Sequence, residues 1–296
     1  MKLYAPRYYK EFKCVADKCQ HSCCTGWEID IDEEALERYQ GLKGGYGDAV
    51  RDSIAMEEVP HFQLLEGDRC PHLDERGLCR IILELGEDCL CDICREHPRF
   101  YNYTHVAEVG IGMSCPEAAR VILDSPNYAI LEEIGEVEAE AECLDFDGRA
   151  ERRRVYALLS EQSLPYTARL KNICDAYEID VGEDEAWLEL LSDLEYLEES
   201  HKNLFLEYRQ ARRKEGCDVY LERFLAYLIF RHSTEATTKE DFSMRLRFCL
   251  FLEGLLASLL SLKGAENLQE IVDLARVVSE EIEYSEDNTF ALMYER

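Results

Sequence analysis

Basic residues are scarce in this chain of 296 residues, because 33 lysines and arginines stand against 62 aspartates and glutamates, for a formal net charge of −29. A protein that binds a nucleic-acid backbone or an anionic membrane needs a basic face. Neither is therefore expected as a partner. The same charge favours a partner that is itself cationic.

Long apolar runs are also missing. The longest stretch, Phe248 to Leu262, contains Glu253, and a membrane-spanning helix needs about 20 predominantly apolar residues. We therefore expect a core helix there. The opening MKLYAPRYYKEFKC has neither an apolar segment nor a small-residue cleavage site that would mark a signal peptide, so the protein is expected to be cytoplasmic.

Several catalytic signatures are absent. The sequence has no phosphate-binding P-loop, no GxSxG and no GxGxxG after a strand, which argues against the usual nucleotide-binding and hydrolase classes. The CxxxCxxC spacing of a typical radical S-adenosylmethionine enzyme is missing too, as is the alternation of strands and helices that its barrel requires.

Cysteine, by contrast, is abundant and unevenly placed. Of the 14 cysteines, those that precede residue 116 are Cys14, Cys19, Cys23, Cys24, Cys70, Cys79, Cys89, Cys91, Cys94 and Cys115. Disulfides do not persist in a reducing cytoplasm, so such a density predicts thiolate ligands to a metal. The other cysteines, Cys143, Cys174, Cys217 and Cys249, are interpreted as small buried apolar residues of helices.

The spacing of the early cysteines favours an iron-sulfur cluster over a single zinc ion. They form the groups Cys14-x4-Cys19-x3-Cys23-Cys24, Cys70-Pro-x7-Cys79, Cys89-x-Cys91-x2-Cys94 and Cys115-Pro. A structural zinc site takes four ligands, typically in two paired knuckles, and this pattern has more cysteines and fewer such pairs. Iron-sulfur clusters are held by thiolates that proline often follows. Zinc, or two separate centres, remains an alternative.

Basic and imidazole side chains accompany these cysteines. Those within five residues of a cysteine include Lys13, Lys18, Arg69, Arg80, Arg95 and Arg99. Cations lower thiol pKa values and would offset the negative charge of a four-thiolate centre; the alternative is that they balance nearby acids. His21, His72 and His97 could be ligands, but hydrogen bonding around the centre is the expected role.

Helical patterns dominate the remainder, so the predicted fold is mainly α. We expect an irregular cysteine-rich metal-binding region, residues 1–146, packed on an acidic helical bundle, residues 147–296. One helix is predicted at 30–42, and another is predicted to begin at Pro116, with Cys115 at its N-terminus. Further helices are predicted near 150–163, 165–178, 201–215, 240–262 and 265–284. Apolar residues at helical spacing also mark Trp187–Leu197 and Tyr220–Leu228 as core faces. A hairpin within 61–85 is expected to present Cys70 and Cys79.

Three stretches carry a family resemblance: KLYAPRYYKEFKCVADKCQHSCCTGWEIDID, CPHLDERGLCRIILELGEDCLCDICREHPRFYNY and VYLERFLAYLIFRHSTEA. They resemble the flagellin lysine-N-methylase (FliB-type) family. The N-terminal part also looks like the YkgJ-type zinc- or iron-chelating domain, through Cys19 to Cys24, Cys70 to Asp74 and Cys94 to Pro98.

The resemblance implies a protein-lysine N-methyltransferase. It would move methyl groups from S-adenosylmethionine to lysine side chains of flagellin, with the cysteines holding a [4Fe-4S] cluster. A neutral lysine requires a proton acceptor; Tyr101, Tyr103, His105 and Glu117 lie near the cysteines, but neither a catalytic nor an S-adenosylmethionine-binding residue is assigned. The alternative is a non-catalytic zinc- or iron-binding protein with a structural or sensory centre. The sequence predicts no oligomeric state.

Overall fold

The computed structural model describes residues 1–296 apart from 20, 140–144, 183, 209–215 and 296. Cys143 thus lies outside the described residues. Two compact units emerge: unit 1 comprises Met1–Phe12 and Arg99–Arg296, and unit 2 comprises Lys13–Pro98. Contacts therefore divide the chain after Phe12 and after Pro98, whereas the sequence suggested a boundary after residue 146.

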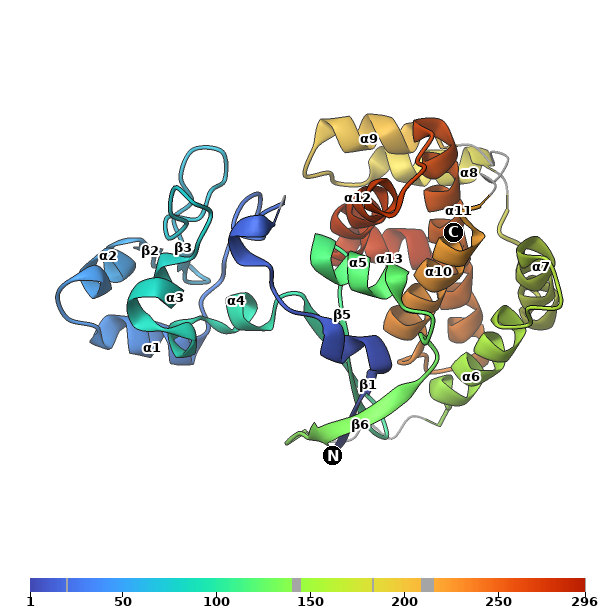
Figure 1. The fold of residues 1–296 in the computed structure, drawn as a ribbon, viewed down its shortest axis with the longest axis horizontal. Coiled ribbons are helices and arrows are strands. Elements are labelled where there is room, and N and C mark those ends of the chain that lie inside the picture. Colours follow the sequence, from blue (N-terminus) through green and yellow to red (C-terminus); the bar gives the residue numbers. More distant parts are fainter. Residues whose placement is uncertain (20, 140–144, 183, 209–215, 296) are drawn as a thin grey trace. The chain divides into compact units, whose positions relative to one another are not determined.

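Unit 1 is mainly helical, as predicted (Figure 1). Its elements are β1 (Lys2–Pro6), η1 (Arg7–Glu11), β4 (Arg99–Tyr103), β5 (Ala107–Ile111), α5 (Pro116–Asp124), β6 (Leu131–Glu136), α6 (Gly148–Leu159), α7 (Tyr166–Tyr177), α8 (Asp184–Asp193), α9 (Glu199–Leu206), α10 (Asp218–Ser233), α11 (Lys239–Lys263), α12 (Leu268–Val278), the π-helical η4 (Ser279–Glu283) and α13 (Glu286–Tyr294). None of the helices in the described part of the chain has both the length and the apolar character needed to cross a membrane.

The core of unit 1 is built around α10 and α11, which pack along each other. The apolar stretch of α11 is buried almost throughout, which confirms the predicted core helix. Trp187 of α8 stacks on Phe251 of α11 with ring centroids 3.7 Å apart, so the predicted stripe at Trp187 is also a core face. Helices α7 and α12 fall within predicted ranges, and α6 begins two residues before its predicted range of 150–163. Helix α9 ends at Leu206, and residues 209–215 of the helix predicted at 201–215 lie outside the described residues.

A four-stranded sheet in unit 1, in the order β4-β5-β1-β6, was not predicted. Strand β1 pairs in parallel with β5 and antiparallel with β6, and β4 pairs antiparallel with β5. The inner strand β5 is buried at every residue, including Glu108. Pairing with these distant segments makes the first residues of the chain part of unit 1.

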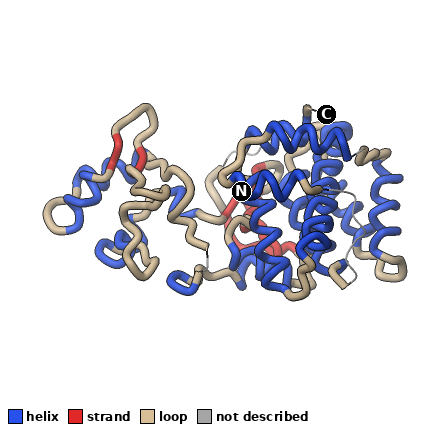
Figure 2. The backbone as a smooth tube through the Cα atoms, turned by 90° about the horizontal axis from the view of Figure 1, so that it is seen from above, coloured by secondary structure: helices blue, strands red, loops and turns tan. Residues whose placement is uncertain are grey.

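Unit 2 consists largely of loops with short helices (Figure 2). Its elements are η2 (Ala16–Lys18), α1 (Glu33–Gly41), α2 (Tyr46–Asp52), β2 (Ile54–Ala55), β3 (His61–Phe62), α3 (Arg80–Leu85), η3 (Glu87–Cys89) and α4 (Asp92–Glu96). The helix predicted at 30–42 is confirmed as α1, whose N-cap Asp32 accepts a hydrogen bond from Ala35 N. The core of this unit is small and contains several cysteines.

The hairpin predicted within 61–85 is only partly correct. Leu73 and Cys79 do form an antiparallel bridge around a turn, but Arg80–Leu85 is the helix α3. Cys79 is its N-cap, and Gly86, with a φ of 95°, ends it. Glycine adopts a positive φ without steric cost, so Gly86 can end the helix there. The apolar residues from Ile81 to Leu85 therefore belong to α3 and not to a second strand.

Two glycines should respond oppositely to alanine. A Cβ on Gly148, at the start of α6, would lie 2.6 Å from the backbone oxygen of Thr234, whereas one on Gly254, within α11, would meet nothing within 4 Å. We expect Gly148→Ala to lower the free energy of unfolding by about 1–3 kcal/mol and Gly254→Ala to raise it by about 0.5–1 kcal/mol. Urea unfolding curves check this; equal effects would contradict the contact at Gly148.

Candidate metal centre

Pairing of two distant segments brings the first cysteines of unit 2 together. Gly26 N donates to Asp68 O (3.0 Å) and Cys70 N donates to Cys24 O (2.9 Å), so the chain around Cys24 runs antiparallel to the chain around Cys70. Each sulfur is thereby carried on backbone that is hydrogen-bonded to the other segment. This pairing joins the Cys-Cys element to the Cys-Pro element.

The turn between Cys70 and Cys79 is organised by Asp74. Its Oδ1 accepts hydrogen bonds from Arg76 N (2.8 Å) and Leu78 N (2.9 Å), an arrangement that aspartate side chains favour in turns. Arg69 Nη2 donates to the carbonyl oxygens of Leu73 and Asp74, each at 2.7 Å. The turn therefore returns the chain so that Cys79 lies beside Leu73.

Helix α1 positions the third cysteine segment. The hydroxyl of Tyr39, which is fully buried, donates to Cys89 O (2.7 Å), and Asp32 Oδ2 accepts from Asp92 N (2.7 Å). Cys91 is the N-cap of α4 and Cys94 lies within that helix. A spacing of three residues places both sulfurs on one side of the first turn.

Five thiols interact electrostatically with one another, and we call them the cysteine cluster: Cys24, Cys70, Cys79, Cys91 and Cys94. They come from the three segments just described. The structure therefore brings together half of the ten predicted ligands. Within the described residues, however, no three histidine, cysteine, aspartate or glutamate side chains surround a common point as the ligands of one metal ion would.

Burial and mutual hydrogen bonds shift the pKa values of these thiols in opposite directions. A hydrogen bond from Cys23 holds the pKa of Cys24 at about 7, and a hydrogen bond from Cys94 lowers the pKa of Cys91. Burial raises the pKa of Cys70 to about 12, and the bond to Cys91, together with burial, raises that of Cys94. Buried neutral thiols become thiolates when a metal supplies the compensating charge.

The remaining predicted ligands have other surroundings. Cys14 Sγ accepts from Ala16 N (3.5 Å), Cys19 Sγ donates to His21 O (2.8 Å) and Cys89 Sγ donates to Leu85 O (3.5 Å). Cys23 is exposed and adjoins the cluster through Cys24. Cys115 is the N-cap of α5, as predicted, which places it in unit 1. Whether any of them binds metal stays a prediction.

His72 lies next to the cluster but uses both ring nitrogens elsewhere. Its Nδ1 is hydrogen-bonded to the Tyr46 hydroxyl (2.6 Å) and its Nε2 to the Ser53 hydroxyl (2.9 Å). Burial lowers the pKa of His72 to about 4, so the ring is neutral at pH 7. One nitrogen of a neutral imidazole donates and the other accepts, and two hydroxyls satisfy both. This favours the hydrogen-bonding role over ligation.

We accordingly expect His72→Gln to retain its metal. Loss of the buried hydrogen bonds should lower the free energy of unfolding by about 1–3 kcal/mol, while iron or zinc per chain stays that of the unaltered protein. Metal analysis beside an unfolding curve checks both. Metal loss as complete as in Cys70→Ala would instead identify His72 as a ligand.

Three of the arginines that were predicted to offset the negative charge of a metal centre have described partners. Arg69 binds turn carbonyls, as described, and Arg95 pairs with Asp92. Arg80 lies over the ring of Tyr46, 4.2 Å from its centroid, and its charge acts on both Tyr46 and His72. Arg80 is thus a cation whose field reaches residues that adjoin the cluster.

Candidate proton acceptors belong to unit 1. Tyr101 and Tyr103 of β4 have parallel rings with centroids 6.0 Å apart. Glu117 accepts two hydrogen bonds from Arg120, at 2.6 and 2.9 Å. That ion pair engages Glu117 within its own helix. No catalytic role is assigned to Glu117, Tyr101, Tyr103 or His105.

Comparison with known proteins supports the predicted family. Lysine-N-methylase from Salmonella typhimurium and from Salmonella choleraesuis are each 29% identical over 143 residues, covering 43% of this chain and 34% of the relative. Flagellar biosynthetic protein FliU from Salmonella muenchen is 29% identical over 140 residues, covering 43% of this chain and 80% of FliU.

The chain spans about a third of the length of the lysine-N-methylases that it matches. No family model matches it, and no solved structure does. The YkgJ-type resemblance of the cysteine segments therefore stays a prediction. Over the part that these relatives share with it, this chain is related to the FliB-type lysine-N-methylases.

Proposed function

We propose that this chain is a lysine N-methyltransferase that modifies flagellin and takes its methyl groups from S-adenosylmethionine. The observation that carries the proposal is the similarity to relatives named lysine-N-methylase. The name of FliU, a flagellar biosynthetic protein, supports a flagellar substrate. The net charge of −29 is also consistent with a lysine-bearing partner, because opposite charge accelerates encounter.

We further propose that the cysteine cluster holds a [4Fe-4S] cluster. Such a cluster takes four thiolates, and the five gathered thiols supply one donor more than that number. Because no three of these side chains surround a common point within the described residues, binding would require the loops and short helices of unit 2 to rearrange around the group. The bound group would supply one-electron chemistry; the residues of this chain would hold it, exclude water and orient the substrate lysine.

The experiment is methyl transfer from labelled S-adenosylmethionine to flagellin, with cluster-replete protein and without oxygen. Label on lysine side chains is the expected result. Flagellin whose lysines have been chemically blocked is the control and should remain unlabelled. Absence of label on unblocked flagellin, with intact cluster content, would refute the enzymatic proposal.

A second candidate is a non-catalytic zinc- or iron-binding protein with a structural or sensory centre. The small core of unit 2 favours it, because a region with few buried apolar side chains gains folding energy from a bound metal. In that case the protein would unfold on chelation and transfer no label. Chelator-induced loss of structure, together with a negative methylation assay, would establish this reading.

A further inference from the structure

Two thiols of the cysteine cluster, Cys91 and Cys94, lie on the same helical turn. Cys91 is the N-cap of α4 (Figure 1), and its carbonyl oxygen accepts a hydrogen bond from Arg95 N at 3.0 Å, so the first helical turn begins there. Cα atoms three residues apart on such a turn are separated by about 5 Å. A disulfide bridges Cα atoms about 4.4–6.8 Å apart, so the backbone holds these residues within disulfide range.

The side chains of this pair also point toward each other. Cys91 Sγ accepts hydrogen bonds from the Cys94 thiol and from Cys94 N. The thiol of Cys23 likewise donates to Cys24, but Cα atoms of adjacent residues are only about 3.8 Å apart, below the disulfide range. The geometry therefore favours Cys91 and Cys94 over Cys23 and Cys24 as a pair that can be oxidised without strain.

Helix α1 fixes the segment that carries Cys91. The Tyr39 hydroxyl donates to Cys89 O, as described, and Arg38 Nη2 donates to Leu90 O at 3.2 Å. These hydrogen bonds hold the two residues before Cys91. Because the backbone is held at a suitable separation, closing a disulfide requires side-chain rotation and little backbone movement.

The two thiols differ in their access to solvent. Cys91 is fully buried, whereas Cys94 is half-buried, so a small oxidant such as hydrogen peroxide reaches Cys94 first. Attack of the Cys94 sulfur on the O–O bond gives a sulfenic acid and one water. The Cys91 sulfur then displaces hydroxide, which takes up the Cys91 proton and leaves as a second water. The two thiols lose two electrons and two protons, and one peroxide becomes two waters.

We propose that Cys91 and Cys94 are a reversible dithiol–disulfide pair, with Cys94 oxidised first, that controls metal uptake by unit 2. Metal ligation requires thiolates, so the disulfide removes two of the five donors of the cysteine cluster. Three remain, fewer than the four that a [4Fe-4S] cluster or a closed zinc site takes. A dithiol reductant restores both donors by thiol–disulfide exchange. Only the effect on metal uptake rests on the proposed metal centre.

Mass spectrometry of tryptic peptides tests the pairing. The complete chain is freed of metal with a chelator under reducing conditions and treated with a stoichiometric amount of hydrogen peroxide, and its remaining thiols are alkylated. Peptide 81–95 contains Cys89 besides the pair, so we expect a single alkyl group, on Cys89, and the loss of two hydrogen atoms. Alkylation of all its cysteines, or linkage to a peptide that carries Cys24, Cys70 or Cys79, would overturn the assignment.

Variants test which thiol is oxidised first. In Cys91→Ser the sulfenic acid on Cys94 has lost its partner, so dimedone should label it. In Cys94→Ser the buried Cys91 should take up about tenfold less label, because oxidation follows exposure. Cys174, also half-buried but outside unit 2, is the matched control and should be alkylated as in untreated protein. Equal labelling of the two variants would overturn the role given to Cys94.

Zinc binding, measured by competition with a chromophoric chelator, tests the control of metal uptake. We expect the oxidised chain to bind zinc about 10- to 100-fold more weakly than the reduced chain, and dithiothreitol to restore the affinity. Equal affinities of the two forms would overturn this control. Failure of the proposed function would appear separately, in the iron and sulfide content and in methyl transfer, neither of which enters the peptide measurement.

Discussion

Cys70→Ala is expected to deprive the protein of its metal, whereas Cys249→Ala is expected to leave the metal content unchanged. The two thiols are both buried, at 5% and 0% exposure. Cys70 interacts with Cys24, Cys79 and Cys91, while Cys249 lies in the core of α11. Loss of a residue that merely supports a ligand costs about 10- to 100-fold in metal affinity, and loss of a ligand should cost at least as much.

Metal content per chain after anaerobic purification measures this effect, with thermal unfolding as a second readout. Cys24→Ala, Cys79→Ala and Cys94→Ala should behave as Cys70→Ala does, and Cys23→Ala was predicted from the sequence to do so too. Cys174→Ala, outside unit 2, should resemble Cys249→Ala. Full metal retention in Cys70→Ala would refute the assignment of the cysteine cluster.

Glu108→Gln should strongly destabilise unit 1. Glu108 of β5 is fully buried and binds Arg152 at 2.6 and 2.9 Å and Arg149 at 2.9 Å. Arg152 is 2% exposed, so removal of the carboxylate charge leaves a buried guanidinium without its counterion. Breaking such a pair costs about 3–5 kcal/mol.

The pH dependence of that loss follows from the pKa of Glu108. Burial alone would raise it, but Arg152 and Arg149 hold it below the ordinary value. A carboxylate whose pKa is lowered on folding stabilises the folded state at pH values above its unfolded-state pKa of about 4.3. This stabilisation is lost as the pH falls through the lower pKa of the folded state. The difference in unfolding free energy between the unaltered protein and Glu108→Gln should therefore be largest at pH 7 and should decrease in acid.

Trp187 provides a local probe for this measurement. The chain has 2 tryptophans, so in a Trp27→Phe background the fluorescence of Trp187 reports on unit 1. Glu133→Gln is the matched control, since Glu133 pairs with Lys2 at 2.7 Å where the two side chains are 45% and 55% exposed. It should change the unfolding free energy by less than about 1 kcal/mol. An equally small effect of Glu108→Gln would show that the buried pair contributes little.

Local patterns in the sequence predicted the helices well because their causes are local. Asp32 caps α1, Pro116 begins α5, and the apolar spacing around Trp187 reports a buried face. The sheet escaped prediction because β1 pairs with segments more than 100 residues away. Nothing within Lys2–Pro6 itself specifies those partners.

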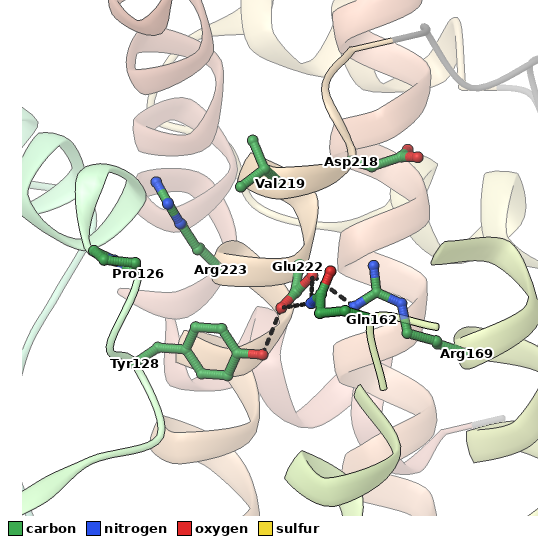
Figure 3. Close-up of a pocket in the computed structure, with 8 residues that line it drawn as sticks. All are labelled: Pro126, Tyr128, Gln162, Arg169, Asp218, Val219, Glu222 and Arg223. Carbon is green, nitrogen blue, oxygen red and sulfur yellow. Dashed lines mark hydrogen bonds and ion pairs between the residues drawn. The ribbon is translucent and has the colours of Figure 1, made fainter. Parts of the chain in front are cut away.

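The sequence showed the groups of cysteines, but it did not show which of the ten cysteines the fold brings together. Cys24 meets Cys70 through backbone pairing of separate loops, and α1 positions the segment around Cys91 through Tyr39 and Asp32. These are tertiary contacts without a spacing signature. A pocket of about 340 Å³ in unit 1, lined by Tyr128, Gln162, Arg169 and Glu222 among others (Figure 3), was missed for the same reason, because its residues are distant in sequence and individually ordinary.

The central claim is that the cysteine cluster holds an iron-sulfur cluster, and analysis of iron, zinc and acid-labile sulfide on protein purified without oxygen tests it most directly. We predict about four irons and four sulfides per chain, with a brown visible chromophore. One or two zinc ions per chain without sulfide would contradict the account and favour the non-catalytic metal-binding protein.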